Sequence, residues 1–491
     1  MSNMKKHIVY ILSDQHNPLI MGAAGDPYVR TPNIDSLYRD GTGFDNCYCA
    51  APLCVPSRAS ILSGLSPSHS GVFNNMQALS SCNATFVNSL TVAGYETVLS
   101  GRMHFVGWDQ WHGFEKHLVG DITPCFVGGD NESEIYGSFM RSSGQNLTSI
   151  RKSGAGNSAV LDYDAAVSSA ACEYLETRGD ERPLFLTVGF YGPHCPYIAP
   201  RELFDYYYDI LPEIEFTDED KKDQMHPAIQ RWYANRNLSE VSPADVRRIR
   251  AAYYAMVEIL DRHVGKLLEV IDRTLGRENT LIVYTSDHGD NIGEHGLFWK
   301  TNFYEGAARV PMVFVEDGWI ESGRRIPETV SLLDLAPTFI TYADAPRLPL
   351  FDGLDLTPVL RDHAAADPSR LVVSMCSDIK GDSPSVMLRQ GRFKFIRHAG
   401  YGEPQLFDLD ADPTELVDLG TNERYSAIVK MFDAVLPQYW DADKALEELD
   451  AAKTHFQIMT KWFRAVKPEL VGEWRGDASR NYLVDVGQAR E

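Results

Sequence analysis

Residues 7–16 read HIVYILSDQH, an almost wholly apolar run, His7–Leu12, followed by polar residues. A short apolar run of this kind indicates a strand that is buried on both faces of a sheet. Polar side chains directly after such a strand lie at its carboxyl end, where open α/β sheets bind ligands. Asp14 and Gln15 are therefore the first candidate site residues.

Apolar strands and helical patterns alternate through most of the chain. We expect further strands at Glu96–Leu99, Leu184–Val188, Thr280–Thr285 and Pro311–Val315. We expect helices at Asn33–Asp40, Pro56–Ser63, Phe86–Ala93, Asp162–Thr177, Pro243–Thr274 and Leu332–Tyr342. Thr31-Pro32 is a start signal for the first helix, with Thr31 as its N-cap. This order predicts an α/β fold with a large, mostly parallel sheet sandwiched by helices.

The pattern changes near residue 370. Short strands at Leu371–Met375, Ser385–Arg389 and Phe393–Arg397 precede a helix near Tyr425–Leu436. They predict a smaller C-terminal α+β subdomain that carries an antiparallel sheet. We therefore divide the chain into a catalytic domain, residues 1–370, and a C-terminal subdomain with a tail, residues 371–491.

An insertion in the catalytic domain and the C-terminal tail lie outside the regular pattern of strands and helices. The stretch Gly120–Gly156 is rich in Gly, Ser and Asn and has little periodicity, which predicts a long surface insertion near the site. The tail after Lys444 contains Trp462, Phe463 and Trp474. These apolar residues predict that the tail docks, either on its own domain or on a partner subunit.

Composition and charge exclude several classes of protein. The chain has 491 residues, 44% hydrophobic and 23% charged, which excludes disordered and low-complexity proteins. Lysine and arginine total 46 against 68 acidic residues, a formal net charge of −22. So acidic a surface repels nucleic acid and anionic membranes, and we expect neither as a partner.

The location of the protein is predicted from its N-terminus and its cysteines. The apolar run after Lys6 ends too early for a secretory signal, and no stretch approaches the roughly 18 apolar residues that span a bilayer. The 8 cysteines are scattered along a long chain, as is typical of reduced thiols. We expect a cytoplasmic protein.

Polar residues follow several of the predicted strands at their carboxyl ends. Besides Asp14 and Gln15, these are Arg102 and His104, then His194, then Asp287 and His288. Any one of them alone is best explained as an ordinary polar residue at a strand end. All of them together predict one site at a single edge of the sheet.

The most specific motif is Cys54-Val55-Pro56-Ser57-Arg58. Other segments accompany it: 71–75 (GVFNN), 100–105 (SGRMHF), 191–196 (YGPHCP), 285–296 (TSDHGDNIGEHG) with Lys300, 393–396 (FKFI), and 406–409 (LFDL) with 412–413 (DP). Together they resemble the type I sulfatases of the alkaline phosphatase superfamily. The resemblance covers nearly the whole chain and is closest to the branch of choline sulfatases, arylsulfatases and phosphonate monoester hydrolases.

The resemblance implies an alkaline-phosphatase-like fold, a modified nucleophile and a metal site. In that family the cysteine at position 54 is oxidised after translation to formylglycine (3-oxoalanine), whose hydrate attacks the ester. By matching motifs, the ligands of one divalent metal ion are Asp14, Gln15, Asp287 and His288, and modified Cys54 completes them. Such oxygen donors with one imidazole suit Ca²⁺ or Mn²⁺.

The resemblance also implies a role for each remaining residue. Arg58 is expected to hold the anionic hydrate, and Arg102 and Lys300 to bind the ester's oxygens. Arg102 stands where the family usually has Lys. Asn75 is expected to add a neutral hydrogen bond, His194 with Lys300 to protonate the leaving oxygen, and His104 to act as the base of the second step.

The resemblance predicts hydrolysis of small anionic esters, namely sulfate monoesters, in the manner of an arylsulfatase. Phosphonate monoester or phosphodiester hydrolysis at the same site is the alternative, since the ligand set is shared. Choline sulfate is a further alternative, less favoured because the insertion offers only Phe126, Tyr136 and Phe139 for an aromatic cage, so that aromatic residues elsewhere would have to contribute. A catalytically inactive relative is disfavoured because every expected position holds a competent residue. The implied partners are a formylglycine-generating enzyme and further copies of the chain, in a homodimer or homotetramer.

Overall fold

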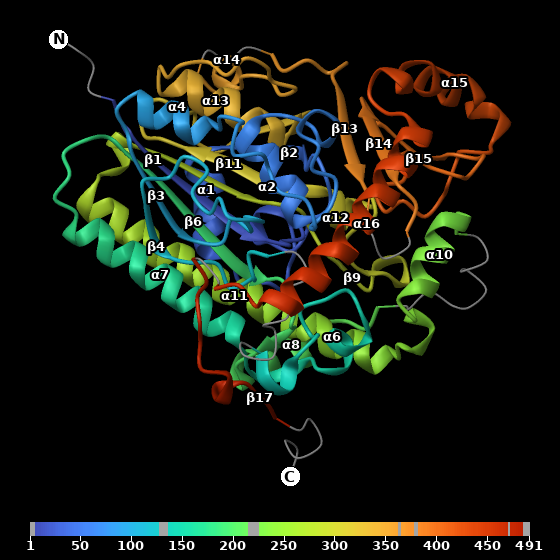
Figure 1. Ribbon diagram of the computed structural model, residues 1–491. Coiled ribbons are helices and arrows are strands. Elements are labelled where there is room, and N and C mark those ends of the chain that lie inside the picture. Colours follow the sequence, from blue (N-terminus) through green and yellow to red (C-terminus); the bar gives the residue numbers. More distant parts are fainter. Residues whose placement is uncertain are drawn as a thin grey trace.

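The computed structural model describes residues 5–126, 136–214, 225–361, 365–377, 382–469 and 472–484. Much of the fold is built around one 8-stranded sheet with strand order β12-β2-β11-β8-β1-β6-β3-β4 (Figure 1). The strands, in chain order, are β1 (His7–Asp14), β2 (Thr42–Tyr48), β3 (Glu96–Gly101), β4 (Lys116–Val119), β6 (Leu184–Pro193), β8 (Thr280–Ser286), β11 (Arg309–Val315) and β12 (Arg324–Ser331). Neighbouring strands are parallel except where β11 pairs with β2 and β8.

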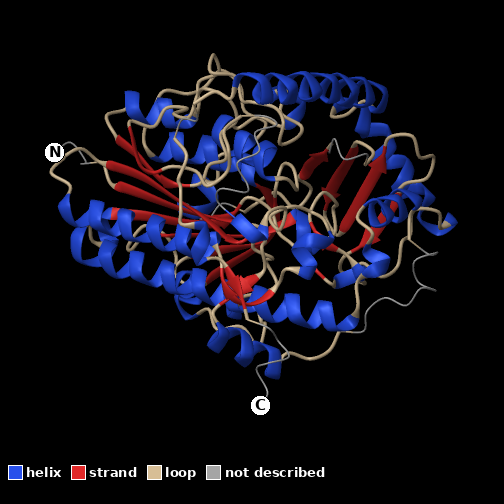
Figure 2. Cartoon of the chain, turned by 60° about the horizontal axis from the view of Figure 1, so that its bottom comes forward, coloured by secondary structure: helices blue, strands red, loops and turns tan. Residues whose placement is uncertain are grey.

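Helices cover both faces of this sheet, as Figure 2 shows. On one face lie α1 (Pro32–Asp40), α7 (Ala159–Thr177), α8 (Arg201–Ile210) and α11 (Pro243–Thr274). On the other face lie α2 (Cys54–Ser63), α4 (Phe86–Val92) and α13 (Leu335–Tyr342). Strand β1 serves both cores, because Val9 and Ile11 face the first set while Ile8, Tyr10 and Leu12 face the second.

Shorter elements connect these layers. The short helices are α3 (Pro67–Ser70), α6 (Leu147–Arg151), α10 (Pro227–Asn235), α12 (Glu305–Ala308) and α14 (Thr357–Arg361). The short strands are β5 (Gly154–Asn157), β7 (Ile198–Ala199), β9 (Asn291–Ile292) and β10 (Phe298–Trp299).

The C-terminal region forms a second, 4-stranded antiparallel sheet. Its strands are β13 (Leu371–Cys376), β14 (Ser385–Gln390), β15 (Phe393–His398) and β16 (Gln405–Asp408). Helix α15 (Ser426–Val435) covers it, and the Phe432 ring stacks on Phe395 with centroids 5.2 Å apart. This confirms the predicted α/β class and the antiparallel sheet; the domain boundary at residue 370 stays a prediction.

The tail packs on the large domain of its own chain. Helix α16 (Ala442–Val466) runs back from the small sheet toward the large one (Figure 1). Its Phe463 and Trp462 contact Phe126, and β17 (Tyr482–Leu483) pairs with β5. Of the two predicted ways of docking, the structure shows the first. Within the described ranges, no helix is both long and apolar enough to cross a membrane.

The predicted elements are present, and most of their ends differ by a few residues. The helix predicted from Pro56 begins at Cys54, and the strand predicted to end at Val188 continues to Pro193. The helix predicted from Leu332 begins as a 3₁₀ turn and becomes α13 at Leu335. The long helix α16 and strand β2 were not predicted, although Ala, Leu, Glu and Lys in α16 and its N-cap Asp441 are local helix signals.

Candidate functional site

The predicted polar residues converge at the carboxyl edge of the large sheet. Asp14 ends β1, Asp287 follows β8, Arg102 follows β3 and His194 follows β6. These strands are immediate neighbours in the order β8-β1-β6-β3, and they run parallel. Parallel pairing therefore brings residues that are nearly 300 positions apart into one cluster, as the strand-end argument predicted.

Cys54 is the first residue of α2, and its side chain reaches the same cluster. Its Sγ lies 3.2 Å from Lys300 Nζ and 3.2 Å from His288 Nε2, and the side chain is buried. Burial alone raises the pKa of the Cys54 thiol. The charges of Lys300 and His288 outweigh burial, so the pKa lies well below its usual value.

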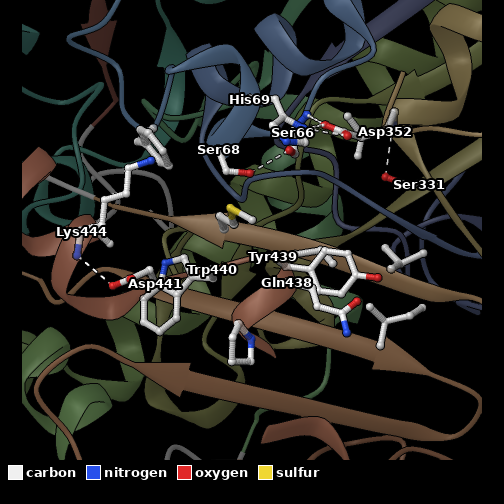
Figure 3. Close-up of a pocket in the computed structure, with 18 of the residues that line it drawn as sticks. Ser66, Ser68, His69, Ser331, Asp352, Gln438, Tyr439, Trp440, Asp441 and Lys444 are labelled. Atoms are coloured by element: carbon white, nitrogen blue, oxygen red, sulfur yellow. Dashed lines mark hydrogen bonds and ion pairs between the residues drawn. The ribbon is translucent and has the colours of Figure 1, made fainter. Parts of the chain in front are cut away.

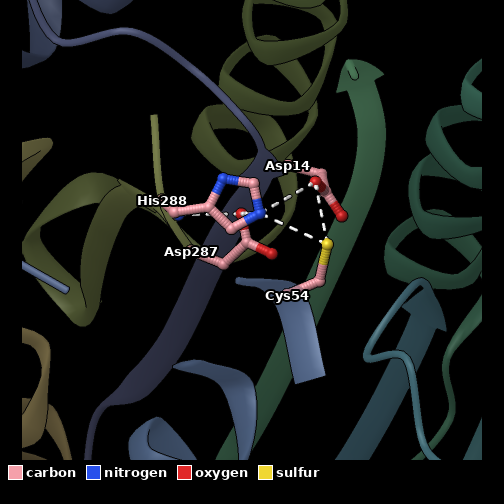
Figure 4. A group of neighbouring side chains, drawn as sticks. All are labelled: Asp14, Cys54, Asp287 and His288. Atoms are coloured by element: carbon pink, nitrogen blue, oxygen red, sulfur yellow. Dashed lines mark hydrogen bonds and ion pairs between the residues drawn. The ribbon is translucent and has the colours of Figure 1, made fainter. Parts of the chain in front are cut away.

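Asp14, Cys54, Asp287 and His288 form one buried group whose ligand atoms all lie within 4.8 Å of one another (Figure 4). His288 Nδ1 donates to the Gly289 carbonyl at 2.9 Å, so its Nε2 faces the group, and loss of the Nε2 proton would free a lone pair there for a cation. Two carboxylates and a free imidazole nitrogen around one point are donors that suit a divalent cation. The residues thus fit the metal site that the sequence predicted.

Gln15 stands beside this group with its amide held in one orientation. Lys300 Nζ donates to Gln15 Oε1 at 2.6 Å. On the other side, Gln15 Nε2 donates to Asp290 Oδ2 at 2.6 Å, and the Tyr197 hydroxyl donates to the same oxygen at 2.7 Å. Because a lysine ammonium only donates, the amide oxygen faces the cation-binding group and the NH₂ faces Asp290. Sequence analysis missed Asp290 and Tyr197, although Asp290 lies within a quoted motif.

Arg58 contacts the carboxylates of Asp14 and Asp287. Its Nε donates to Asp287 at 2.8 Å and its Nη2 to Asp14 at 3.0 Å, while Nη1 donates to the Arg102 carbonyl at 2.8 Å. The guanidinium is buried and does not line the cavity described below. It therefore orients and neutralises the two carboxylates, and its contact with an anionic hydrate stays a prediction.

Arg102 does line the cavity and is held by acidic neighbours. Its Nε donates to Asp14 at 2.6 Å and its Nη1 to Asp121 at 3.0 Å and to Thr123. Together with Arg58 and His194, it outweighs the effects of burial and of the Cys54 thiolate on Asp14. The pKa of that carboxyl lies well below its usual value. Asp121 was not among the predicted residues, because its role depends on its contact with Arg102, which forms only in the folded chain.

Arg102 also fixes the protonation of His104. Its Nη2 lies 2.7 Å from His104 Nδ1. Since a guanidinium only donates, Nδ1 must accept, and the neutral ring carries its proton on Nε2. Burial and the Arg102 charge both lower the pKa of His104. In this arrangement His104 is a donor toward position 54, and its role as the base of the second step stays a prediction.

His194 has the opposite arrangement. Its Nδ1 donates to the Cys195 carbonyl at 2.7 Å, so Nε2 is the nitrogen presented to the site. Its ring packs edge-on against Tyr191, with centroids 4.8 Å apart. The buried Asp164 accepts from the Tyr191 and Gly192 amides at 2.7 and 2.8 Å, which holds this loop in place.

Lys300 lies on a segment whose backbone is strained. Trp299 and Thr301 on either side of it have φ of 63° and 66°, in the left-handed region that bulky and β-branched residues rarely adopt. Such strain costs on the order of 1–3 kcal/mol per residue and concentrates at functional sites. This backbone conformation places the Lys300 ammonium within hydrogen-bond distance of Cys54 and Gln15.

A cavity of about 260 Å³ opens over Cys54. The predicted residues that line it are Gln15, Cys54, Asn75, Arg102, His104, His194 and Lys300. Asn75 Oδ1 accepts from the Val55 amide at 3.0 Å, which leaves its NH₂ to face the cavity. None of the described residues that line the cavity is an aspartate or a glutamate. An anion therefore meets cations and neutral donors there.

The predicted insertion reaches this cavity only in part. Phe126 and the segment Ser143–Gln145 line it, whereas Tyr136 and Phe139 are buried in the core. Tyr191 and Trp299, from outside the insertion, also line the cavity. Residues 127–135 of the insertion lie outside the described residues.

A larger cavity of about 510 Å³ lies away from this site, between α3 and the segment that leads into α16 (Figure 3). It is lined by Ser66, His69, Asp352 and Tyr439 among others, and His69 Nδ1 lies 2.8 Å from Asp352. None of the predicted site residues lines it. Size alone therefore does not identify the functional site; the cluster of perturbed titratable groups does.

Comparison with known proteins gives the same picture. A family model described as "Sulfatase" matches residues 6–345, and one described as "N-sulphoglucosamine sulphohydrolase, C-terminal" matches residues 293–441. A choline-sulfatase of Rhizobium meliloti (strain 1021) is 35% identical over 470 residues, covering 92% of this chain and 89% of the relative. An arylsulfatase of Clostridium perfringens (strain 13 / Type A) is 28% identical over 482 residues, covering 90% and 98%.

Solved structures share the fold. The phosphonate monoester hydrolase of Agrobacterium radiobacter superposes with a TM-score of 0.72 at 21% identity, covering 91% of this chain and 96% of the other. A protein solved in complex with its substrate D-Glucosamine-2-N, 6-O-disulfate superposes with a TM-score of 0.70 at 21% identity, covering 91% and 98%.

Proposed function

The chain belongs to the sulfatase family, whose members are sulfuric ester hydrolases, and from that premise we propose that it hydrolyses small sulfate monoesters at Cys54. The proposal includes conversion of Cys54 to formylglycine by a separate maturation enzyme. One observation carries it: the cavity over Cys54 is lined by the cations Arg102 and Lys300 and, among the described residues, by no carboxylate.

This arrangement suits a singly charged anion in a protein of net charge −22. A sulfate monoester carries its charge on three non-bridging oxygens, which need donors on several sides. Arg102, Lys300 and the Asn75 NH₂ supply donors from three different elements. Buried cations in a site of low dielectric act far more strongly than surface charges do.

Asp14, Gln15, Asp287 and His288 would hold a divalent cation beside residue 54. When bound, that cation would supply Lewis-acid activation of the modified side chain of residue 54 as the nucleophile. Arg58 holds both carboxylates in place through its bonds to Asp14 and Asp287. His104, which carries its proton on Nε2, donates to an oxygen on residue 54 and orients it.

The leaving oxygen needs a proton as its bond to sulfur breaks. Lys300 Nζ and His194 Nε2 both face the region of Cys54, and Lys300 lies 3.2 Å from its Sγ. The carbonyl of Cys195 holds the first ring proton of His194 on Nδ1, so a second proton on Nε2 is the one available for transfer. We propose that these two residues together protonate the leaving oxygen.

Phosphonate monoesters are the second candidate substrates. Their tetrahedral centre also carries one negative charge, and the cations of the cavity bind it by the same contacts. The fold shared with a phosphonate monoester hydrolase is compatible with this chemistry.

The first experiment measures kcat/KM for 4-nitrophenyl sulfate and for a 4-nitrophenyl phosphonate monoester. The protein is coexpressed with a formylglycine-generating enzyme and supplied with Ca²⁺ or Mn²⁺, and Cys54→Ala is the blank. We expect a clear preference for the sulfate and no activity above background in the variant. A preference for the phosphonate would replace the proposed substrate class and leave the nucleophile in place.

Mass spectrometry of the tryptic peptide Asp40–Arg58 tests the modification separately. We expect the mass change that converts the Cys54 thiol to an aldehyde. If the peptide keeps an unmodified thiol under coexpression while the ester is still hydrolysed, the formylglycine part of the proposal is wrong.

A further inference from the structure

The wall of the cavity next to Lys300 and His194 carries an amide that the proposed chemistry does not use. Gln145 lines the cavity and is only 9% exposed. It comes from the insertion between β4 and α6, which the sequence predicted to lie near the site. What this amide can bind depends on whether its oxygen or its NH₂ faces the cavity.

The hydrogen bonds of Gln145 fix its orientation. Arg236 Nε donates to Gln145 Oε1 at 3.2 Å, and the Thr301 hydroxyl donates to the same oxygen at 3.1 Å. A guanidinium only donates, so the atom that faces Arg236 must be the oxygen. A flipped amide would set NH₂ against N–H.

Thr301 cannot reverse this arrangement. Its hydroxyl already accepts from Trp232 Nε1 at 2.8 Å and from Arg236 Nη2 at 3.1 Å. Its single proton therefore goes to Gln145 Oε1. Arg236 is itself fixed by Asp382 at 2.6 Å and by stacking on the Trp232 ring, with its Cζ 4.0 Å from the centroid.

The amide oxygen of Gln145 is thus saturated, and its NH₂ is the group left for the cavity. Among the described residues, no hydrogen bond from Gln145 Nε2 is found, and the residue lines the open cavity. A ligand that excludes water from the cavity must supply an acceptor to this donor or leave it unpaired at a cost in free energy.

The position of Gln145 assigns it to the alcohol part of the ester. Its partner Thr301 is the neighbour of Lys300 in the chain. The Ser143 carbonyl, two residues before Gln145, accepts from Cys195 Sγ at 3.3 Å, and Cys195 is the neighbour of His194. The segment Ser143–Gln145 therefore contacts the neighbours of both residues that we assign to the leaving oxygen.

We infer that Gln145 is a specificity-determining residue, and that the substrate is the sulfate ester of a small alcohol that bears a further oxygen acceptor, such as a polyol or a monosaccharide. This inference rests on the proposed function. The cavity of about 260 Å³ has room for an alcohol of that size. A hydroxyl, ether or carboxylate oxygen next to the ester satisfies the Gln145 NH₂.

The same wall disfavours choline sulfate. A trimethylammonium group has no acceptor and would leave the NH₂ of Gln145 unpaired. It would also share the cavity with Arg102 and Lys300, and no described lining residue supplies a carboxylate to balance it. Sites that hydrogen-bond a substrate group reject analogues that lack that group strongly, because their own polar groups lose their partners.

The test compares kcat/KM for glycerol 1-sulfate, choline sulfate and 3,3-dimethylbutyl sulfate, the uncharged carbon analogue of choline sulfate. We expect the matured wild type to prefer glycerol 1-sulfate over both by about tenfold or more, the value of one well-placed hydrogen bond. Gln145→Leu keeps the size of the side chain and removes the donor, so the glycerol-to-dimethylbutyl ratio should fall by about tenfold.

Gln145→Glu keeps an oxygen for Arg236 and Thr301 and replaces the NH₂ by a second oxygen. It should raise the ratio of choline sulfate to dimethylbutyl sulfate by about tenfold. Gln457→Leu, the same change at an exposed position of α16, is the control and should alter neither ratio. Melting temperatures of all variants check that each is folded.

The inference is overturned if choline sulfate is the best of the three for the wild type, or if neither variant changes its ratio. Failure of the proposed function looks different, since all three sulfates are then inert while a phosphonate ester is hydrolysed. In that case the methylphosphonate esters of the same alcohols apply the same comparison to Gln145, with the same two ratios deciding.

Discussion

At the scale of single residues, Asp290 explains why an amide stands among the carboxylates of the metal group. Asp290 is fully buried, and its Oδ2 accepts from Gln15 and Tyr197. A carboxylate at position 15 would meet Asp290 at the present 2.6 Å with like charge. Gln15 avoids this because its NH₂ donates to Asp290 while its oxygen remains available as a ligand.

The first prediction concerns Asp290→Ala. The variant removes the carboxylate that accepts from the Gln15 NH₂, so only Lys300 still orients the Gln15 amide with its oxygen toward the cation. We expect the affinity for Ca²⁺ or Mn²⁺ to fall by about 10- to 100-fold, the usual effect of losing such an outer partner. Calorimetric titration of metal into the protein measures it directly.

The matched control is Asp272→Ala at an exposed position of α11, which should leave metal affinity unchanged. Equal affinities for the Asp290 variant and the wild type would show that Gln15 keeps its orientation without Asp290.

At the scale of elements, α1 is capped by another helix rather than by its own N-cap residue. The Thr31 hydroxyl donates to Asp35 and caps no backbone amide. Asp261 of α11 accepts instead from the Asn33 and Ile34 amides at 3.0 and 2.7 Å. Thr31 is the N-cap residue followed by Pro32, as predicted, but the capping hydrogen bonds come from Asp261, which ties two helices of the same face together.

The second prediction follows from that contact. Asp261→Ala leaves two amides at the start of α1 without an acceptor, and we expect unfolding free energy to fall by about 1–3 kcal/mol. Asp261→Asn keeps the Oδ1 acceptor and should cost less. Urea denaturation of both variants beside the wild type measures the difference. Similar losses for Ala and Asn would contradict the capping role.

The third prediction concerns His398 in the small sheet. His398 is buried between Ser385 and Gln405, with its ring stacked on His226 at 4.8 Å. Burial, and then the nearby His226, lower the pKa of His398 to about 3. The folded state therefore holds it neutral, whereas the unfolded chain protonates it near pH 6.5.

The stability that neutral His398 contributes is complete above pH 6.5 and is lost as pH falls toward 3. Relative to His398→Gln, which does not titrate, the wild type should lose about 1.4 kcal/mol of unfolding free energy for each pH unit below 6.5. Denaturation of both proteins at pH 6.5 and 4.5 tests this, because other titrating groups cancel in the difference. A difference that does not change with pH would refute it.

At the scale of the whole molecule, the end of the chain holds part of the site in place. Asp121 N donates to the Gly472 carbonyl at 2.9 Å, and Trp474 N donates to the Asp121 carbonyl at 2.8 Å. The Asp121 carboxylate in turn accepts from Arg102 and from the His104 amide at 2.7 Å. A tail segment thus supports the anion-binding side of the cavity, while the metal group lies on other elements.

The fourth prediction is that a chain ending at Lys467 loses kcat/KM and keeps its metal affinity. A small displacement of Arg102 and His104 should lower kcat/KM for the sulfate ester by about 10- to 100-fold. Gly120→Ala is a gentler test of the same contact, because an added Cβ would lie 2.0 Å from the Gly472 oxygen. Loss of metal affinity in parallel with activity would indicate general unfolding instead of this local effect.

Many of the residues that form the site could be predicted from the sequence, because strand ends and motifs are local features. Asp14, Cys54, Asp287 and His288 form one buried group, as the matching motifs implied. The fold class followed from alternating strands and helices. The hydrogen-bond partners of Arg58 and His104 were not predicted, since they depend on which residues these side chains meet in the folded chain.

The sequence by itself determined the α/β class, the edge of the sheet where the site lies and the residues that gather there, because parallel strands place their carboxyl ends together. Only the tertiary structure decided how those residues are used. Arg102 forces the proton of His104 onto Nε2, Asp290 orients Gln15, and Arg236 turns the NH₂ of Gln145 toward the cavity. Each is a hydrogen bond between residues whose contact no local pattern encodes, and its direction follows from which partner can only donate or only accept.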